Sequence, residues 1–109
     1  MVEYLNIAVE QGLILHPHSD AAVVEALFKK RPELKILWAH AGFYEPAPVV
    51  ARMLDQYPNL WAELSYRAAH IMPDDDLDPD WKALLIRHAG RFTIGSATWQ
   101  VDRWHEESF

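Results

Sequence analysis

The chain has 109 residues, of which 50% are apolar and five are tryptophan, so it suits one small domain with a core, residues 1–109. Its formal charge of −6 argues against a nucleic-acid partner and against an anionic membrane surface. Cysteine is absent, which excludes disulfides and thiolate chemistry, and no apolar run reaches the roughly 20 residues of a membrane span. The N-terminus lacks the pattern of a signal peptide, so we expect a cytoplasmic protein without a membrane partner.

Helices and strands are predicted to alternate along the first half of the chain. Apolar residues at helical spacing cover residues 2–11, and Gly12 suits the position after a helix end. A short buried strand then ends at His16, and Ser19 or Asp20 caps a second helix. That helix covers residues 21–30 and is predicted to bury Val23, Val24, Leu27 and Phe28.

The apolar run that follows is predicted to be a buried strand over residues 35–40, with His40 at its carboxyl end. Pro46 or Pro48 opens the next helix, and a third strand covers residues 60–66. A long acidic connection leads to a helix capped by Asp78. A fourth strand covers residues 92–95, and residues 96–109 begin one more helix.

Strands that alternate with helices imply right-handed crossovers and a parallel sheet. We therefore predict an α/β fold with four parallel βα units. Four such strands form an open sheet, or half of an eight-stranded barrel, which typically needs about 250 residues.

Two histidines stand at the ends of consecutive predicted strands. The carboxyl ends of parallel strands share one edge of the sheet, so His16 and His40 are expected side by side. Imidazole in that place is a usual ligand of zinc, while the alternative is an ordinary hydrogen-bonding role for each histidine. His18 follows Pro17, and we interpret it as an exposed loop histidine.

The third strand carries a carboxylate and ends in two candidate binding residues. Glu63 needs a partner, and we predict a structural ion pair with an Arg or Lys of a neighbouring strand rather than a catalytic acid. Tyr66 and Arg67 either bind a substrate carboxylate or anchor a loop. Residues 74–76 lack the Gly and the bidentate Glu of a calcium loop, so we interpret them as a solvated loop.

Four segments taken together resemble the amidohydrolase superfamily, in particular the amidohydrolase 2 branch of predicted metal-dependent hydrolases with the TIM-barrel fold. The segments keep the order and spacing of the family and are residues 14–16, 38–42, 64–67 and 91–96. The resemblance covers nearly the whole chain and implies strands five to eight of a (β/α)₈ barrel.

The resemblance also implies a chemistry. His16 and His40 match the strand-five and strand-six histidines, which bind metal or position the substrate. Members of the family activate a metal-bound water for attack on a carbonyl or related centre, with a strand-eight aspartate as ligand or general base. Some members are decarboxylases instead. The implied cofactor is a divalent metal ion, with zinc as the expected one.

The chain departs from the family pattern at two places. Ala97 stands at the position of the strand-eight aspartate, and a methyl group neither binds metal nor accepts a proton. The first-strand His-x-His pair is absent, since the sequence starts at about the fourth helix of the barrel. A catalytic zinc normally has three protein ligands, so we expect a lone chain to be inactive.

Four strands without partners leave two open edges, which favour association. We expect exposed apolar residues on the inner face of the sheet, including some of Ile36, Trp38, Trp61 and Ile94. The expected partner is a second copy that completes the barrel or shares the sheet, or a missing N-terminal half.

Three functions remain open from the sequence. The first is a metal-dependent hydrolase or lyase, and the second is a non-catalytic half-barrel that serves as an assembly or binding module. The third is a binder of a small molecule at a rim formed by Tyr44, Tyr66, Arg67 and Trp99.

Overall fold

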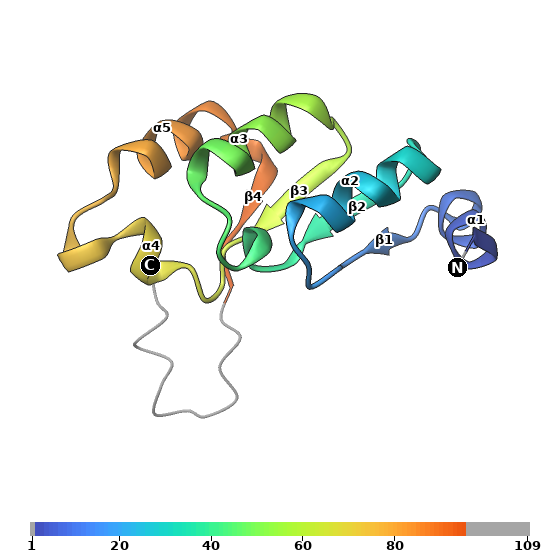
Figure 1. Cartoon of the computed structure of the whole chain (residues 1–109), viewed down its shortest axis with the longest axis horizontal. Coiled ribbons are helices and arrows are strands. Elements are labelled where there is room, and N and C mark those ends of the chain that lie inside the picture. Colours follow the sequence, from blue (N-terminus) through green and yellow to red (C-terminus); the bar gives the residue numbers. More distant parts are fainter. Residues whose placement is uncertain (1, 96–109) are drawn as a thin grey trace, which may run out of the picture.

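The computed structural model describes residues 2–95, whose helices and strands alternate (Figure 1). The helices are α1 (Val2–Gln11), α2 (Ala21–Lys30), α3 (Ala47–Gln56), α4 (Ala68–Ile71) and α5 (Pro79–Arg87). The strands are β1 (Ile14–Leu15), β2 (Lys35–Trp38), β3 (Leu60–Glu63) and β4 (Phe92–Thr93). Three short 3₁₀ turns complete the order, namely η1 (Ala39–Gly42), η2 (Pro73–Asp75) and η3 (Ala89–Arg91).

The four strands form one parallel sheet in the order β1-β2-β3-β4. Figure 1 shows α2, α3 and α5 on the same side of this sheet. The predicted α/β fold with four parallel βα units is therefore confirmed, and its arrangement is that of half a (β/α)₈ barrel. The carboxyl ends of all four strands lie at one edge of the sheet, as a parallel arrangement requires.

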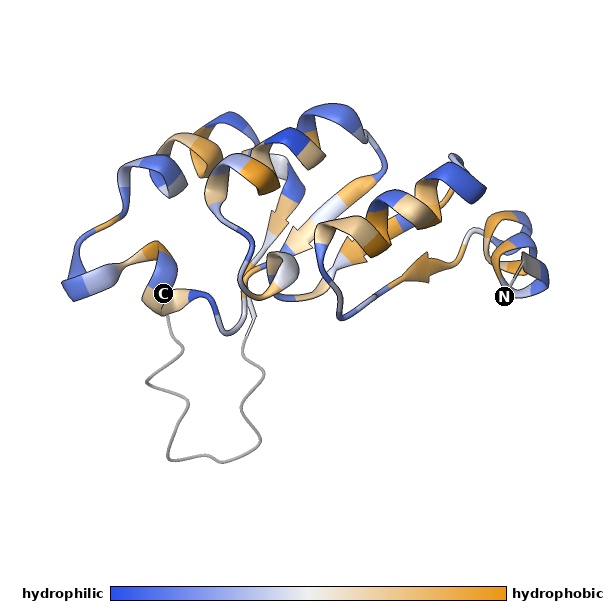
Figure 2. Cartoon of the chain, viewed as in Figure 1, coloured by the Kyte–Doolittle hydropathy of each residue, from blue (hydrophilic) through white to orange (hydrophobic). Residues whose placement is uncertain are grey.

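The core lies between the sheet and the helices. Because strand residues alternate between two faces, Ile36 and Trp38 of β2 share a face with Leu60 and Ala62 of β3, and all four are fully buried. Figure 2 shows apolar residues along the strands and polar residues on the outward sides of the helices. Of the four residues among which we expected exposed members, Ile36 and Trp38 are not exposed.

Other predicted inner-face residues behave differently. Ile94 is 69% exposed, as expected, and Trp61 is half-buried. Val23 of α2 was predicted to be buried but is 46% exposed, because Val24 and Phe28 supply the buried side of that helix.

The predicted starts of α2 and α5 and the predicted end of α1 are confirmed. The carboxylate of Asp20 accepts a hydrogen bond from the Val23 N–H over 3.1 Å at the start of α2, and Asp78 accepts one from the Trp81 N–H over 3.0 Å at the start of α5. Gly12 follows α1 with a φ of +67°, a left-handed conformation that glycine adopts without steric cost.

The strands end earlier than predicted. β2 stops at Trp38 and β3 at Glu63, because His40, Ala41 and Tyr66 have φ values of 55°, 45° and 65°. A positive φ is incompatible with a strand, so the chain turns before each predicted strand end. The long acidic connection also contains the short helix α4.

The final predicted helix and the position of Ala97 lie outside residues 2–95, the part of the chain that the structure describes. Within that part, no helix has both the length and the apolar character to cross a membrane.

Candidate functional site

The candidate site lies at the carboxyl ends of β2 and β3. His40 stands two residues after β2 and Ser65 two residues after β3, and both are buried. The Nδ1 atom of His40 lies 2.8 Å from the hydroxyl oxygen of Ser65 and 3.0 Å from its main-chain carbonyl oxygen. The two parallel strands therefore bring together two residues that are 25 positions apart in the sequence.

The Ser65 carbonyl determines which nitrogen of His40 carries a proton. A carbonyl oxygen only accepts hydrogen bonds, so Nδ1 of His40 is the donor in this contact. In the neutral ring the other nitrogen, Nε2, then has a free lone pair. This is the nitrogen that is able to bind a metal ion or to accept a proton.

Glu63 supports the same arrangement from the end of β3. Its carboxylate accepts hydrogen bonds from the His40 N–H over 2.9 Å and from the Ser65 N–H over 2.7 Å, and one oxygen lies 3.4 Å from Nδ1 of His40. Burial raises the pKa of Glu63, but the hydrogen bonds from Ser65 and His40 and the charge of His40 outweigh burial, so the pKa lies below its usual value. A Cβ at Gly95 would lie 3.3 Å from this carboxylate, so the chain after β4 also approaches it.

The predicted partner of Glu63 is wrong. The carboxylate instead accepts hydrogen bonds from the His40 and Ser65 N–H groups and lies 3.4 Å from Nδ1 of His40, and among residues 2–95 no Arg or Lys pairs with it. The strand pattern did not predict these partners, because the N–H groups of His40 and Ser65 and the imidazole belong to turns that follow the strands.

Three imidazole rings follow one another at this rim. The ring centroids of His16 and His18 are 5.3 Å apart, and those of His18 and His40 are 5.2 Å apart. His16 and His18 are exposed, whereas His40 is 6% exposed. The interpretation of His18 as an exposed loop residue is confirmed, but it did not include the place of its ring between the other two. A His-x-His pattern directly after a strand was the signal that pointed to it.

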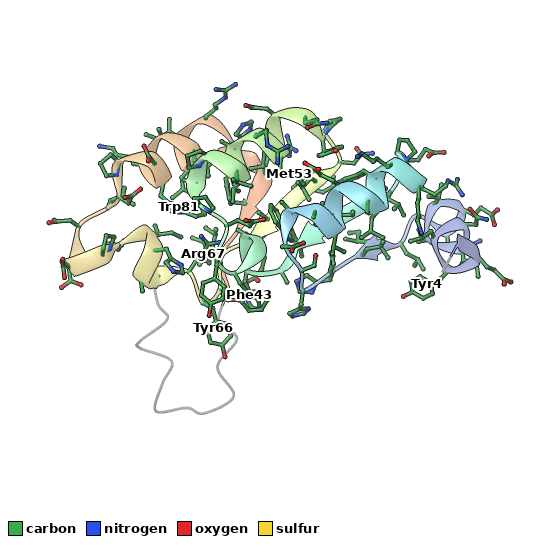
Figure 3. The ribbon with its side chains drawn as sticks, viewed as in Figure 1. Tyr4, Phe43, Met53, Tyr66, Arg67 and Trp81 are labelled. Carbon is green, nitrogen blue, oxygen red and sulfur yellow. The ribbon has the colours of Figure 1, made fainter. Side chains whose placement is uncertain are left out.

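The aromatic rings of two further residues contact His40. Tyr66 lies edge-on to the imidazole at 5.1 Å, and Phe43, which the sequence analysis did not single out, lies at 4.4 Å. Figure 3 shows Phe43 and Tyr66 close together at this edge of the fold. The role of Tyr66 in binding a substrate remains a prediction.

Arg67 is buried, with 1% of its surface exposed. Its guanidinium donates hydrogen bonds to the carbonyls of His40 (3.1 Å), Ala41 (2.8 Å) and Glu45 (2.6 Å). It also lies 4.8 Å from the ring centre of Trp81, and Figure 3 shows the two side chains together. Burial lowers the pKa of Arg67 to about 10, against the opposing charge of Glu45. These contacts match the loop-anchoring alternative, and a direct role in substrate binding remains a prediction.

The turns around His40 contain unusual backbone conformations. His40, Ala41, Phe43 and Tyr66 all have φ values between 45° and 65°. A left-handed non-glycine residue costs of order 1–2 kcal/mol and persists only where surrounding contacts hold it, as at many functional sites. Here the carbonyl contacts of Arg67 are such a restraint.

A hollow of about 440 Å³ lies beside this rim, and its lining includes Tyr44, Arg67 and His70. Nδ1 of His70 accepts a hydrogen bond from Nε of Arg67 over 3.1 Å. Burial and the neighbouring charge of Arg67 both lower the pKa of His70. Two residues of the predicted small-molecule rim, Tyr44 and Arg67, line this hollow. Tyr66 lies next to His40, and Trp99 lies outside the described residues.

The donor groups at the rim fit a divalent metal ion in part. Imidazole nitrogens suit zinc, and metal-binding histidines usually donate their other ring N–H to a carbonyl or carboxylate, as His40 does to Ser65. Across residues 2–95, however, no group of three or more His, Cys, Asp or Glu side chains is arranged to hold a metal ion. A catalytic zinc normally has three protein ligands, so the described residues supply only part of such a centre.

Comparison with known proteins identifies a family. The model of a protein family described as amidohydrolase matches residues 2–98, a range that includes all four strands and the rim. No curated protein and no solved structure matches the chain.

Proposed function

This chain belongs to the amidohydrolase family, and from that premise we propose that it supplies the ends of four strands to the active site of a metal-dependent hydrolase. In this proposal His16 and His40 bind the metal ion, with zinc as the expected ion, and Tyr66 and Arg67 bind the substrate. When bound, such an ion lowers the pKa of a coordinated water and polarises a carbonyl group.

The contact between His40 and Ser65 carries the proposal. Because the Ser65 carbonyl holds the proton on Nδ1, the lone pair of Nε2 is available in the neutral ring. Glu63 accepts a hydrogen bond from the main chain of the same histidine, so both the ring and the backbone of His40 are restrained. A preorganised imidazole of this kind suits a metal ligand better than a surface histidine does.

We further propose that one copy of the chain does not hydrolyse a substrate alone. The described residues bring fewer than three ligands together, and β1 and β4 form the two edges of the described sheet. Ile14 on β1 is 62% exposed, which leaves apolar surface at one of these edges. A second copy related by a two-fold axis, or an N-terminal half of the barrel, would supply the remaining strands and ligands.

The metal part of the proposal is tested by zinc uptake of the purified chain, measured by elemental analysis after gel filtration. We expect His16→Ala and His40→Ala each to lower the zinc content. His88→Ala is the control, because His88 lies at the end of α5 and its ring contacts Asp55 of α3. Wild-type protein that retains no zinc, both alone and after mixing with the first half of a family member, would contradict the proposal.

The hydrolase part is tested with a panel of p-nitrophenyl esters and amides in the presence of zinc. We expect no turnover above that of free zinc for a monomeric fraction, and turnover after reconstitution with the first half of the barrel. The mass of each fraction is measured by light scattering. A reconstituted complex that binds zinc but hydrolyses none of the panel would favour the second candidate below.

The second candidate is a non-catalytic half-barrel that serves as an assembly or binding module. It is supported by the incomplete ligand set among residues 2–95. This candidate predicts a stable oligomer in the absence of zinc, together with no hydrolysis under any of the conditions above.

A further inference from the structure

The hollow of about 440 Å³ beside the rim is lined by three short segments of the chain. They are residues 44–48 at the start of α3, residues 67–73 around α4, and residues 78–81 at the start of α5. Its volume lies in the usual range of small-molecule sites. The three imidazoles of the rim are not part of this lining, so a molecule in the hollow occupies a place of its own beside the strand ends.

His70 offers a hydrogen-bond donor to a molecule in this hollow. Its Nδ1 atom accepts the hydrogen bond from Nε of Arg67 over 3.1 Å, and a guanidinium only donates, so the proton of the neutral ring is on Nε2. His70 is exposed and lines the hollow, so a ligand reaches it from solvent. The ring of Tyr44, a residue that is 85% exposed, lies 6.1 Å from the imidazole and adds a hydroxyl group to the same lining.

Arg67 adds a positive charge to the lining. Its hydrogen bonds go to three main-chain carbonyls and to His70, all of them neutral groups. Within residues 2–95 no carboxylate forms an ion pair with it, and the carboxylate of Glu45, whose charge acts on Arg67, is bound to the Ala21 N–H over 2.6 Å. A buried cation with neutral acceptors favours a negative group nearby, because charges interact strongly where water is excluded. The side chains of Arg67 and His70 together therefore suit a ligand carboxylate.

Two carboxylates bring the opposite charge to the same hollow. Asp78 and Asp80 both line it at the start of α5, and Oδ2 of Asp78 accepts the hydrogen bond from the Trp81 N–H. Asp80 is exposed, so its carboxylate is accessible to a ligand. A purely anionic ligand would be repelled by these carboxylates, and a purely cationic one by Arg67. The remaining lining includes the ring of Trp81 and three prolines, which suit an apolar part of a ligand.

We propose that this hollow binds a small zwitterion of the α-amino acid class. The ligand carboxylate accepts the hydrogen bond from Nε2 of His70 in the positive potential of Arg67, and the ligand ammonium group lies against Asp78 and Asp80. The inference goes beyond the proposed function, because it needs no metal ion and shares only Arg67 with the residues proposed to bind the substrate. One copy of the chain is enough, since all the lining residues belong to it.

The test compares amino acids with analogues that lack one of the two charges. The full chain, treated with a chelator, is titrated at neutral pH with L-leucine, with 4-methylpentanoate, which lacks the ammonium group, and with 3-methylbutylamine, which lacks the carboxylate. L-Phenylalanine, 3-phenylpropanoate and phenethylamine form a second set. The NMR resonances of the His70 imidazole report binding in the wild-type protein.

Asp80→Asn is the central variant, because Asp80 is exposed and its substitution leaves the cap formed by Asp78 in place. Asp75→Asn is the matched control, since Asp75 is also exposed but does not line the hollow. Circular dichroism of each variant establishes that the fold is retained.

We expect at least one of the two amino acids to bind at least about fivefold more tightly than both of its analogues, with a shift of the His70 resonances. Asp80→Asn is expected to weaken amino-acid binding at least about threefold and not to weaken carboxylate binding, while Asp75→Asn leaves both within about twofold. An amino acid that binds no better than its carboxylate or its amine analogue overturns the inference, as does equal binding by Asp80→Asn and Asp75→Asn. No binding of either amino acid also overturns it. Because zinc is absent throughout, none of these results changes the outcome of the zinc-uptake test of the proposed function.

Discussion

The guanidinium of Arg67 donates a hydrogen bond to the main-chain carbonyl of His40 over 3.1 Å. The same group reaches the carbonyls of Ala41 and Glu45, so one side chain after β3 satisfies three acceptors in the turn after β2. Since His40 and Ala41 are in the left-handed region, this contact links a strained backbone to a buried cation. The position of the His40 ring therefore depends on a residue 27 positions away in the sequence.

Removal of this guanidinium is expected to destabilise the fold. Arg67→Met leaves the carbonyls of Ala41 and Glu45 without this donor, whereas the His40 carbonyl keeps its hydrogen bond from the Phe43 N–H over 2.9 Å. Each unsatisfied group costs about 1–3 kcal/mol, so we expect a loss of roughly 2 kcal/mol or more in the free energy of unfolding. Arg67→Lys is expected to restore only part of it, because an ammonium group lacks the planar fork that reaches several carbonyls. Urea denaturation measures both variants.

Arg87→Met is the matched control for Arg67→Met. Arg87 is exposed and pairs with Asp55 over 3.1 Å, and an exposed ion pair of this kind contributes about 0–1 kcal/mol. Equal losses for Arg67→Met and Arg87→Met would show that the guanidinium does not hold the turn.

The charge of Arg67 also affects His70. Burial and the nearby guanidinium both lower the pKa of His70, because each disfavours the protonated imidazole. Arg67→Met removes the charge, so the pKa of His70 is expected to rise toward the usual histidine value of 6.5, while Arg67→Lys is expected to keep it low. An NMR titration of the His70 ring measures the change, and the same pKa in all three proteins would rule out an electrostatic link.

Local sequence signals were enough to predict the helices. The features that the sequence did not predict, the strand ends and the place of His18, involve contacts between residues far apart in the sequence. The caps at Asp20 and Asp78 are read within four residues of each helix start, so those helices were placed correctly. The ends of β2 and β3 were misplaced because residues with positive φ follow both strands, and the turn after β2 is bound by Arg67 from a distant part of the sequence. Similarly, the place of His18 depends on the hydrogen bond from Trp38 to Ser19, which joins residues 19 positions apart. Neither the hydrogen bond from Arg67 nor the one from Trp38 can be predicted from an apolar run of residues that ends in a histidine.

Alanine substitutions at Gly42 and Gly12 distinguish two costs of adding a methyl group, backbone strain and steric overlap with neighbouring side chains. Both have positive φ, +81° and +67°, so alanine at either position costs about 1–2 kcal/mol in backbone strain. A Cβ at Gly42 would also lie 2.5 Å from the ring of Trp38 and 2.6 Å from Cγ of Glu45, whereas a Cβ at Gly12 has no neighbour within 4 Å. We expect Gly42→Ala to cost about 1–3 kcal/mol more than Gly12→Ala, because the surrounding side chains have no space to move.

The difference between the two glycine variants is measured by urea denaturation. The carboxylate of Glu45 accepts a hydrogen bond from the Ala21 N–H over 2.6 Å, and Trp38 is fully buried, so neither contact of Gly42 is relieved at low cost. If Gly42→Ala proved no more destabilising than Gly12→Ala, the close packing of this turn against Trp38 would be refuted.

Glu63 is expected to make the stability of the fold depend on acid pH. Burial raises the pKa of this carboxyl, but hydrogen bonds from Ser65 and His40 and the charge of His40 bring it below the usual glutamate value of 4.5. Because the folded-state pKa is lowered, the carboxylate stabilises the folded state above the unfolded pKa, and this stabilisation is lost as the pH falls through the folded value. Glu63→Gln should therefore be less stable than the wild type at pH 7, with a difference that shrinks below about pH 4.5.

Urea denaturation at pH 7, 5, 4 and 3 measures the stability of Glu63→Gln and of the wild type, with Glu10→Gln at an exposed position of α1 as the control. A difference between Glu63→Gln and the wild type that stays constant over this range would mean that the carboxylate is not the ionised partner of His40 and Ser65.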